Sequence, residues 1–388
     1  MKKALILSYK YVESAPRILK EIDWLEGEGW NVDTVGLGSF ERSKGNHFEL
    51  SSSSTVSRFL AYLTPFNKSR FSFLIGRHLS AITPELLSSY DLLIVHDLTL
   101  LPSEVLQMEI SRRKGVGVQI DLHEDHLDSL ARNLVESFVF DAYRKWELEH
   151  LKEATRPFAK GMSFTAVSDR ISSRFSEFLG AKVFTVRNAP RFRQLQPSVV
   201  NEDLIQLVHH GVGAPHRGIE ASIRALKHLE PKFELHLLLL SSSLFLIRIR
   251  LLILFLGLRG RVFVHPPVPT PQISSFINEF DVALMVIPPV TVNELHAMPN
   301  KFFESVQACL AIVTGPNPDL AAEVRERKLG VVAAGWSWRD ILLSVSAVPV
   351  ENWSIYKLNA SKNAGRYSAT IDQSNFLRAV AQTSNHEA

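Results

Sequence analysis

The chain has 388 residues, of which 46% are hydrophobic and 21% are charged, a composition typical of a globular protein and not of a disordered or fibrous one. Its length predicts two domains, because single cores rarely grow beyond about 250–300 residues. The formal net charge of +3 is nearly neutral and gives no support to nucleic-acid binding. The only cysteine, Cys309, excludes an intramolecular disulfide and a cysteine-type zinc site, which favours a reducing, cytoplasmic location.

Short apolar runs alternate with helix-length amphipathic segments through the first half of the chain. The first apolar run stops at Ser8, too early for a secretory signal, and predicts a strand over Lys3–Ser8. Ser14 predicts the N-cap of the helix that follows, and Ser168 that of a later helix reaching Phe178. The remaining strands expected in this half cover residues 31–36, 91–95, 117–122, 162–167 and 183–186.

The second half repeats this alternation. Its expected strands cover residues 204–209, 233–240, 262–265, 282–286, 311–314 and 330–333. Such alternation builds parallel sheets covered by helices on both faces. We therefore expect an α/β protein with two Rossmann-like, doubly wound domains facing a central cleft, over residues 1–190 and 191–355. A helical tail over 356–388 is expected to complete the second domain and to pack back on the first. Ligands of such sheets bind outside the carboxyl ends of the strands.

The segment Met298–Cys309 follows a predicted strand and carries candidate anion-binding residues. Pro299 suits the first turn of a helix, whose free amides and macrodipole attract a diphosphate. Lys301 adds a cation to that turn, and Glu304 offers two acceptor oxygens suited to ribose hydroxyls. An ordinary amphipathic helix, with Lys301 and Glu304 paired at its surface, explains the spacing equally well.

A second candidate segment, Val208–Glu220, lies between a predicted strand and a predicted helix. Gly211 and Gly213 stand where the backbone of a βα turn must approach a ligand closely. Arg217 can present a planar fork to phosphate oxygens. Glycine and arginine are also tolerated in βα turns that bind nothing, so this segment gains weight only beside the first one.

Together the two segments resemble retaining glycosyltransferases of the GT-B fold, of the glycosyltransferase 1 / family four type. Members carry Pro-Asn-Lys-Leu-Phe-Glu and Arg-Gly-(Ile/Leu)-Glu stretches, which Pro299–Glu304 and Arg217–Glu220 match here. Further segments are similar to motifs of the family and occur in the expected order. They cover residues 15–21, 96–98, 101–102, 121–124 and 186–190.

The resemblance implies transfer of a hexose-type sugar from a nucleoside diphosphate donor, of the UDP or GDP type, to a hydroxyl acceptor with retention. His123 and Glu304 would be the catalytic residues, His123 contacting the transferred sugar and Glu304 holding the donor ribose. Arg217, Lys301 and the amides around Asn300 would bind the diphosphate. These cations and the helix terminus would stabilise the leaving group, so no metal or cofactor is expected. The acceptor would be a glycan, a lipid-linked sugar or a small molecule.

The chain departs from the family pattern in three places. His296 stands where a second glutamate is common, with Glu294 close by, and Val212 replaces a common phosphate-binding arginine. A glycine pair often found after the first strand is also missing. A nucleotide-sugar epimerase of the same architecture and a non-catalytic nucleotide- or glycan-binding scaffold therefore stay open as alternatives.

Other histidines and carboxylates allow further interpretations. The polar residues of 121–126 could form a metal cluster, but further ligands are lacking, and a polar loop lining the cleft is favoured. His209 and His210 are expected to be a partly buried packing pair. Cys309 is expected to be inert core.

Two stretches predict contact with a membrane. Residues 50–84 contain no acidic residue and place basic residues among aromatic ones, a pattern that docks on anionic lipid, although a core-facing helix explains it equally well. Leu244–Leu258 is strongly apolar, but it is too short and, with Arg248 and Arg250, too charged to span a bilayer. A buried helix, an interfacial helix and a subunit contact all fit it. Peripheral contact at the inner face of the membrane would suit a lipid-linked acceptor.

Overall fold

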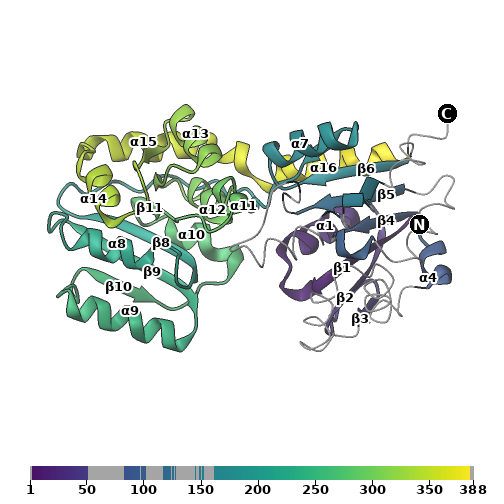
Figure 1. Ribbon diagram of the computed structural model, residues 1–388, viewed down its shortest axis with the longest axis horizontal. Helices are drawn as coiled ribbons and strands as arrows, with labels where there is room; N and C mark the ends of the chain where they lie inside the picture. Colours follow the sequence, from purple (N-terminus) through teal and green to yellow (C-terminus); the bar gives the residue numbers. More distant parts are fainter. Residues whose placement is uncertain are drawn as a thin grey trace. The chain divides into compact units, whose positions relative to one another are not determined.

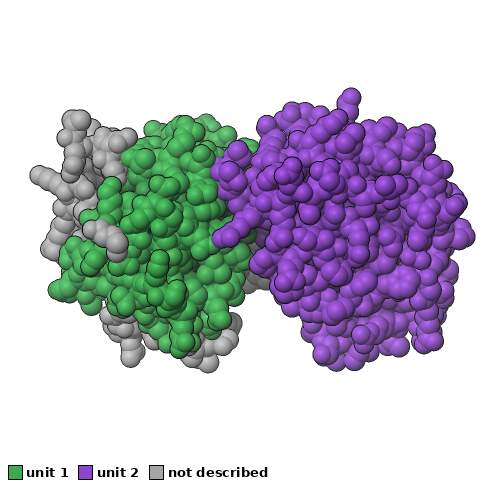
Figure 2. Space-filling model, turned by 180° about the vertical axis from the view of Figure 1, so that it is seen from behind, with its two compact units in different colours: residues 1–188, 372–388 green, residues 189–371 purple. Residues whose placement is uncertain are grey.

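The computed structural model describes residues 2–50, 83–96, 98–101, 117–123, 125, 127, 145, 148–149, 151–152 and 161–384. Each half of the chain builds one parallel sheet with flanking helices (Figure 1), which confirms the expected pair of Rossmann-like domains. The chain divides into unit 1, residues 1–188 with 372–388, and unit 2, residues 189–371 (Figure 2). The predicted membrane stretch over 50–84 lies almost wholly outside the described residues, as do Asp97, Pro102, Glu124 and His126.

Unit 1 contains a seven-stranded parallel sheet in the order β3-β2-β1-β4-β5-β6-β7. Its strands are β1 (Lys3–Tyr11), β2 (Asn31–Leu37), β3 (His47–Leu50), β4 (Leu92–Val95), β5 (Gly117–Leu122), β6 (Met162–Ala166) and β7 (Val183–Thr185). The helices described here are η1 (Val12–Ser14), α1 (Pro16–Gly27), α4 (Pro84–Ser88), η2 (Leu98–Leu100) and α7 (Asp169–Leu179). The central strands are buried along their whole length, which explains their apolar sequences.

Two local predictions in unit 1 are wrong. Strand β3 is not predicted, because this short edge strand is only partly buried and lacks a clear apolar run. Ser14 does not cap α1; its hydroxyl donates to the carbonyl of Tyr11, and Ala15 is the N-cap. Pro16, with its fixed φ, begins that helix instead. The Ser168 cap of α7 is confirmed, because its hydroxyl accepts from the amide of Ile171.

Unit 2 contains a six-stranded parallel sheet in the order β10-β9-β8-β11-β12-β13. Its strands are β8 (Ile205–Gly213), β9 (Phe233–Ser241), β10 (Val262–His265), β11 (Val282–Met285), β12 (Ala311–Thr314) and β13 (Gly330–Val332). Its helices, as described, include α8 (Ile219–Leu226), α9 (Ser243–Phe255), η3 (Thr270–Gln272), α10 (Ile273–Ile277), α11 (Val292–Leu295), α12 (Asn300–Gln307), α13 (Pro318–Glu326), α14 (Trp338–Ser346), α15 (Val350–Asn363) and η4 (Ala364–Tyr367). The predicted strands of this unit are confirmed, but β8 continues past its expected end at His209 to Gly213.

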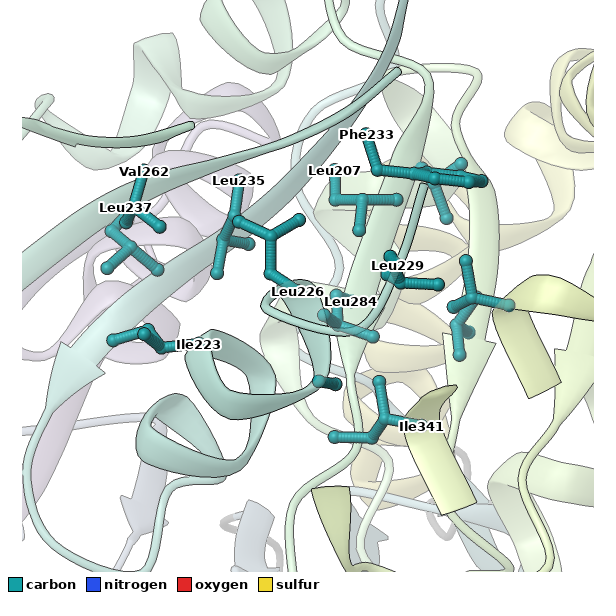
Figure 3. Close-up of a cluster of buried hydrophobic side chains, with 14 of the residues drawn as sticks. Leu207, Ile223, Leu226, Leu229, Phe233, Leu235, Leu237, Val262, Leu284 and Ile341 are labelled. Carbon is teal, nitrogen blue, oxygen red and sulfur yellow. The ribbon is translucent and has the colours of Figure 1, made fainter. Parts of the chain in front are cut away.

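The core of unit 2 lies between the sheet and the helices that cover it. Figure 3 shows Leu207 and Leu235 of the sheet in one cluster with Ile223 of α8 and Ile341 of α14. These side chains are fully or almost fully buried. Burying them removes apolar surface from water, which is worth about 1.5–3 kcal/mol for each large aliphatic side chain.

A buried ion pair fastens α15 to the sheet of unit 2. The ammonium of Lys357 is 2.9 Å from an oxygen of Asp281, and it also donates to the carbonyl of Phe280 at 2.8 Å and to the hydroxyl of Ser198 at 2.7 Å. A buried charge is tolerated when it is paired and its donors are satisfied. Lys357 is therefore a structural lysine.

The last helix, α16 (Ala369–Ser384), begins in unit 2 and continues into unit 1 from Asp372. In unit 1 the ring of Phe376 lies 5.5 Å from that of Trp24, and the amide of Asn375 donates to the carbonyl of Thr185 at 2.9 Å. The end of the chain therefore completes the first unit. Among the described helices, none combines the length and the apolar character needed to cross a bilayer.

Gly218, at the start of α8, passes close to the end of β11. Its φ is +78°, and a Cβ there would lie 2.1 Å from the carbonyl oxygen of Val286. Gly257 has a similar φ of +72° but nothing within 4 Å of a Cβ. We expect Gly257→Ala to lower the free energy of unfolding by about 1–2 kcal/mol, the cost of left-handed backbone. Gly218→Ala should lower it by a further ~1–3 kcal/mol because of the clash. Chemical denaturation of both variants checks this, and equal losses would contradict it.

Candidate functional site

The carboxyl end of β8 lies beside the first turns of α12 in unit 2. The ammonium of Lys301 is 3.2 Å from Nε2 of His209, and Nε2 of His210 is 2.9 Å from Oε2 of Glu304. Both histidines and Glu304 are buried. The alternative in which Lys301 and Glu304 pair at the helix surface is therefore wrong. The interpretation of His209 and His210 as a packing pair is also wrong, because buried polar rings need partners and find them in α12.

The two histidines have defined roles as donor and acceptor. A carboxylate only accepts hydrogen bonds, so Nε2 of His210 donates to Glu304. An ammonium only donates, so Nε2 of His209 accepts from Lys301. Burial, followed by the charges of Lys301 and His210, holds the pKa of His209 well below its usual range. His209 is therefore neutral.

Lys301 is a half-buried cation without a contacting carboxylate among its described partners. Desolvation above all, and then the charge of Arg217, lower its pKa to about 8, and Glu304 only partly opposes them. A lysine in this setting is stabilised by an incoming anion, which supplies the opposite charge. Perturbed lysines of this kind are common at functional sites.

Of the two predicted site glycines, Gly211 lies next to this lysine. Its φ is +104°, and a Cβ there would lie 3.2 Å from Cε of Lys301. The missing side chain thus leaves room around the ammonium. Gly213 is placed differently, because a Cβ there would meet Ser241 and Leu239 of β9. It allows close packing between the two strands.

A small pocket of about 70 Å³ lies at the start of α12. Arg217 and Pro299 line it together with Glu294 and Asn317. Pro299 is the N-cap of α12 and not, as predicted, a residue of its first turn, so the exposed Asn300 begins the helix. Asn317 was not predicted from the sequence, although it follows β12 closely and the strand-end rule could have found it.

His296 stands where a second glutamate is common in the family that the sequence resembles. Its Nδ1 lies 3.5 Å from a carboxylate oxygen of Asp319. Glu294 instead lines the pocket, with Oε1 3.9 Å from the guanidinium of Arg217. Val212 is 53% exposed. The carboxylate nearest to Arg217 in the pocket is thus supplied by Glu294.

In unit 1, a buried network joins α1 to the ends of β4 and β5. Nε2 of His96 is 2.6 Å from Oε2 of Glu21, and its Nδ1 is 2.8 Å from Nε2 of His123. Arg17 donates two hydrogen bonds to Asp121, at 2.7 and 2.5 Å. His123 is the partly exposed member, with 20% of its side chain accessible.

The pKa values of this network assign its protons. Burial disfavours a charged His96, but Glu21 and Asp121 outweigh it and raise the pKa of His96 to about 9. Burial and the charges of His96 and Arg17 outweigh Asp121 and lower the pKa of His123 to about 3. Burial alone would raise the pKa of Asp121, yet Arg17 above all holds it well below the usual range. A protonated His96 therefore donates to Nε2 of a neutral His123, whose proton is on Nδ1.

His96, Asp121 and His123 could also be considered as metal ligands, because one ligand atom of each lies within 4.8 Å of the others. However, a metal ligand histidine must be neutral with a free lone pair, and His96 is protonated. Both oxygens of Asp121 already accept from Arg17. The donor set therefore fits an internal ion network better than a cation site.

Arg17 and Glu21 were not predicted as part of the site. They stand four residues apart on α1, among the buried Ile18 and Ile22. Two opposite charges at this spacing within an apolar stripe are the signal that could have found them.

No protein-family model and no curated protein matches this chain. Solved structures match it over almost its whole length. HepE from Anabaena in complex with UDP is 13% identical with a TM-score of 0.67, covering 98% of this chain and 100% of that chain. Sucrose-phosphate synthase from Thermosynechococcus elongatus is 11% identical with a TM-score of 0.70, covering 98% and 99%. A glycosyltransferase from Rickettsia africae ESF-5 is 11% identical with a TM-score of 0.68, covering 99% of each chain. At these identities the likeness shows the fold, and it confirms the GT-B architecture expected from the sequence.

We expect Glu21→Gln to lower the pKa of His96 from about 9 toward or below its ordinary value, because Glu21 is the strongest of the groups that raise it. A pKa raised by folding stabilises the native state below pH ~6.5 and loses that contribution as pH rises through about 9. The variant should lose this part of the pH dependence of unfolding.

An NMR titration of the His96 ring checks this prediction. Glu26→Gln is the matched control on the same helix, because the half-buried Glu26 pairs with Arg42 and its loss should leave His96 unchanged. An unaltered His96 titration in Glu21→Gln would contradict the assignment.

Proposed function

We propose that this chain is a glycosyltransferase that moves a sugar from a nucleoside diphosphate donor to a hydroxyl acceptor, with retention and without a metal ion. The observation that carries the proposal is the half-buried Lys301 at the start of α12, beside Gly211 and one turn from Glu304. Among the structural neighbours, HepE has been solved with UDP and with UDP-glucose. These complexes support a nucleotide sugar, of the UDP or GDP type, as the donor.

The diphosphate is assigned to the start of α12. Lys301 supplies a cation that is short of an anion, and Arg217 supplies a second, half-exposed one in the adjoining pocket. The unpaired amides at Asn300 and the helix macrodipole add to the attraction. A diphosphate in this place would restore the charge balance around Lys301.

The ribose is assigned to Glu304. Oε2 accepts from His210, which holds the carboxylate in one orientation. Within the described hydrogen bonds, Oε1 has no partner, and it can accept from a ribose hydroxyl. His210 is therefore a positioning residue for the proposed ribose contact.

In the proposed reaction, the bond between the anomeric carbon and the diphosphate oxygen breaks while a bond to the acceptor oxygen forms on the same face. The acceptor proton leaves with the diphosphate, so atoms and charge balance. Lys301, Arg217 and the helix amides stabilise the negative charge that develops on the leaving group. In unit 1, a neutral His123 held by His96 is proposed to donate Nδ1–H to the transferred sugar.

The acceptor is proposed to be a glycan or a lipid-linked sugar. We place the protein in the cytoplasm, at the inner face of the membrane. The reduced, buried Cys309 suits that compartment, and burial raises the pKa of its thiol and keeps it unreactive.

We expect Glu304→Ala to weaken binding of the matching nucleoside diphosphate about 10- to 100-fold, because hydrogen bonds to a charged group contribute about 1.5–3 kcal/mol. Calorimetry with UDP and GDP and their sugars, with and without EDTA, checks this. Glu326→Ala, an exposed carboxylate on α13, is the control and should bind normally.

The same panel distinguishes the alternatives. Binding that is insensitive to EDTA and lost in Glu304→Ala supports the proposed site. If wild-type protein binds none of the ligands, the scaffold alternative replaces the transferase. Conversion of the donor sugar without any acceptor would indicate an epimerase.

Affinity for the diphosphate should fall as pH rises through about 8, because Lys301 is charged below its pKa and neutral above it. A bound anion raises that pKa, so binding takes up as much as one proton and the slope approaches about tenfold per pH unit. Lys301→Met should bind weakly with little pH dependence in this range, whereas Lys362→Met, an exposed lysine on α15, should behave like wild type. Calorimetry from pH 7 to 9.5 measures the slope. The same slope in Lys301→Met would refute the role of this lysine.

A further inference from the structure

Helix α9 of unit 2 is apolar on two opposite faces. Its inner face, formed by Phe245, Ile249 and Ile253, is buried in the core. Its outer face is exposed and consists of Leu244 (80% exposed), Ile247 (51%), Leu251 (59%), Leu254 (48%) and Phe255 (86%). Figure 1 shows α9 along one border of its unit, next to the edge strand β10. A contiguous exposed face of five large apolar side chains is typical of a surface that binds a protein or a membrane.

The charged residues that α9 itself carries, Arg248 and Arg250, are both basic. At 100° per residue, Arg248 and Arg250 lie about 80° to either side of its centre. Both are exposed, and Arg248 also forms a 3.2 Å ion pair with Glu220 of α8. The sequence contains no acidic residue between Glu234 and Glu279. The face is therefore apolar in the middle and basic along both sides.

A basic pocket adjoins the carboxyl-terminal half of α9. It has a volume of about 240 Å³ and lies between α8, α9 and the start of α14. Arg224, Lys227 and His228 line it from one side, and Phe255 of the outer face is part of its wall. The described residues that line it include no carboxylate. The ring of His228 stacks on Trp338 with 4.8 Å between centroids, and this stacked pair forms part of the pocket wall.

We propose that the outer face of α9 and this basic pocket form a docking surface for a membrane that contains anionic phospholipid. The apolar side chains enter the boundary between headgroups and acyl chains, as in interfacial helices. Arg248 and Arg250 extend their charged ends to lipid phosphates on either side. The pocket holds one further headgroup phosphate between Arg224 and Lys227.

A second copy of this chain fits the surface less well. A two-fold dimer places the same patch on both sides of the interface. Contact through α9 would therefore bring basic residues of one copy toward those of the other, and the outer face of the helix carries no acidic residue to pair with them. A membrane supplies both the apolar layer and the negative charges. This inference does not depend on the proposed transferase activity.

The test is co-sedimentation of the full chain with phosphatidylcholine vesicles, with and without phosphatidylglycerol, at low and high salt. We expect binding at least tenfold stronger to the anionic vesicles, and its loss at high salt. Arg248→Gln with Arg250→Gln should weaken binding about 30-fold, since each basic residue near the surface contributes about fivefold. Arg224→Gln with Lys227→Gln should weaken it similarly, and Leu251→Ser with Phe255→Ser should abolish it.

Matched controls lie on the same unit. Ile355→Ser with Leu358→Ser removes exposed apolar side chains of α15, and Arg325→Gln with Lys362→Gln removes exposed charges elsewhere. Both should bind vesicles like wild type. Nucleoside diphosphate binding in solution should be the same in all of these variants, so failure of the membrane proposal and failure of the proposed function are distinguishable.

Three results would overturn the proposal. The first is equal binding to neutral and anionic vesicles, or no binding to either. The second is vesicle binding that the α9 variants do not change. The third is a dimer, seen by sedimentation equilibrium, that Leu251→Ser with Phe255→Ser converts to a monomer, because the face would then be an interface between copies.

Discussion

Both units depend on a parallel sheet that is buried on both faces. Such a sheet leaves apolar side chains as the favoured choice in the middle of a strand, and polar groups concentrate where the strands end. In unit 2, β8 is apolar and buried at Leu207 and Val208 and turns polar at His209 and His210. In unit 1, β4 ends immediately before the buried His96. The polar, titratable side chains are therefore positioned at the strand ends by the same burial that forms the core.

Two lysines of unit 2, the buried Lys357 and the half-buried Lys301, differ in how the protein satisfies their charges. Lys357 contacts a carboxylate, a carbonyl and a hydroxyl, and it fixes α15 to the sheet. Lys301 contacts the neutral ring of His209, and burial has lowered its pKa to about 8. The first charge is satisfied by the protein, whereas the second has no carboxylate among its described contacts. This contrast, more than the motif around it, is the physical basis of the proposed donor site.

The GT-B architecture persists here at 11–13% identity to the compared solved structures. Identity can fall this low because a fold requires a pattern of burial and turns, which many sequences supply. Details of the site are freer to vary. Near Arg217, a pocket carboxylate comes from Glu294, while His296 lies against Asp319. The outer face of α9 is a further feature that the fold itself does not require.

The sequence by itself determined the strand–helix alternation, the two-domain organisation and the candidate residues Lys301 and Glu304, because apolar periodicity and turn chemistry are local. It missed β3, whose half-exposed edge position leaves no apolar run. Only the tertiary structure decided that β8 meets α12 through His209 and His210, because side chains far apart in sequence become neighbours through packing. Packing alone also decided which face of α9 is buried, since both of its faces are apolar and local pattern does not distinguish them.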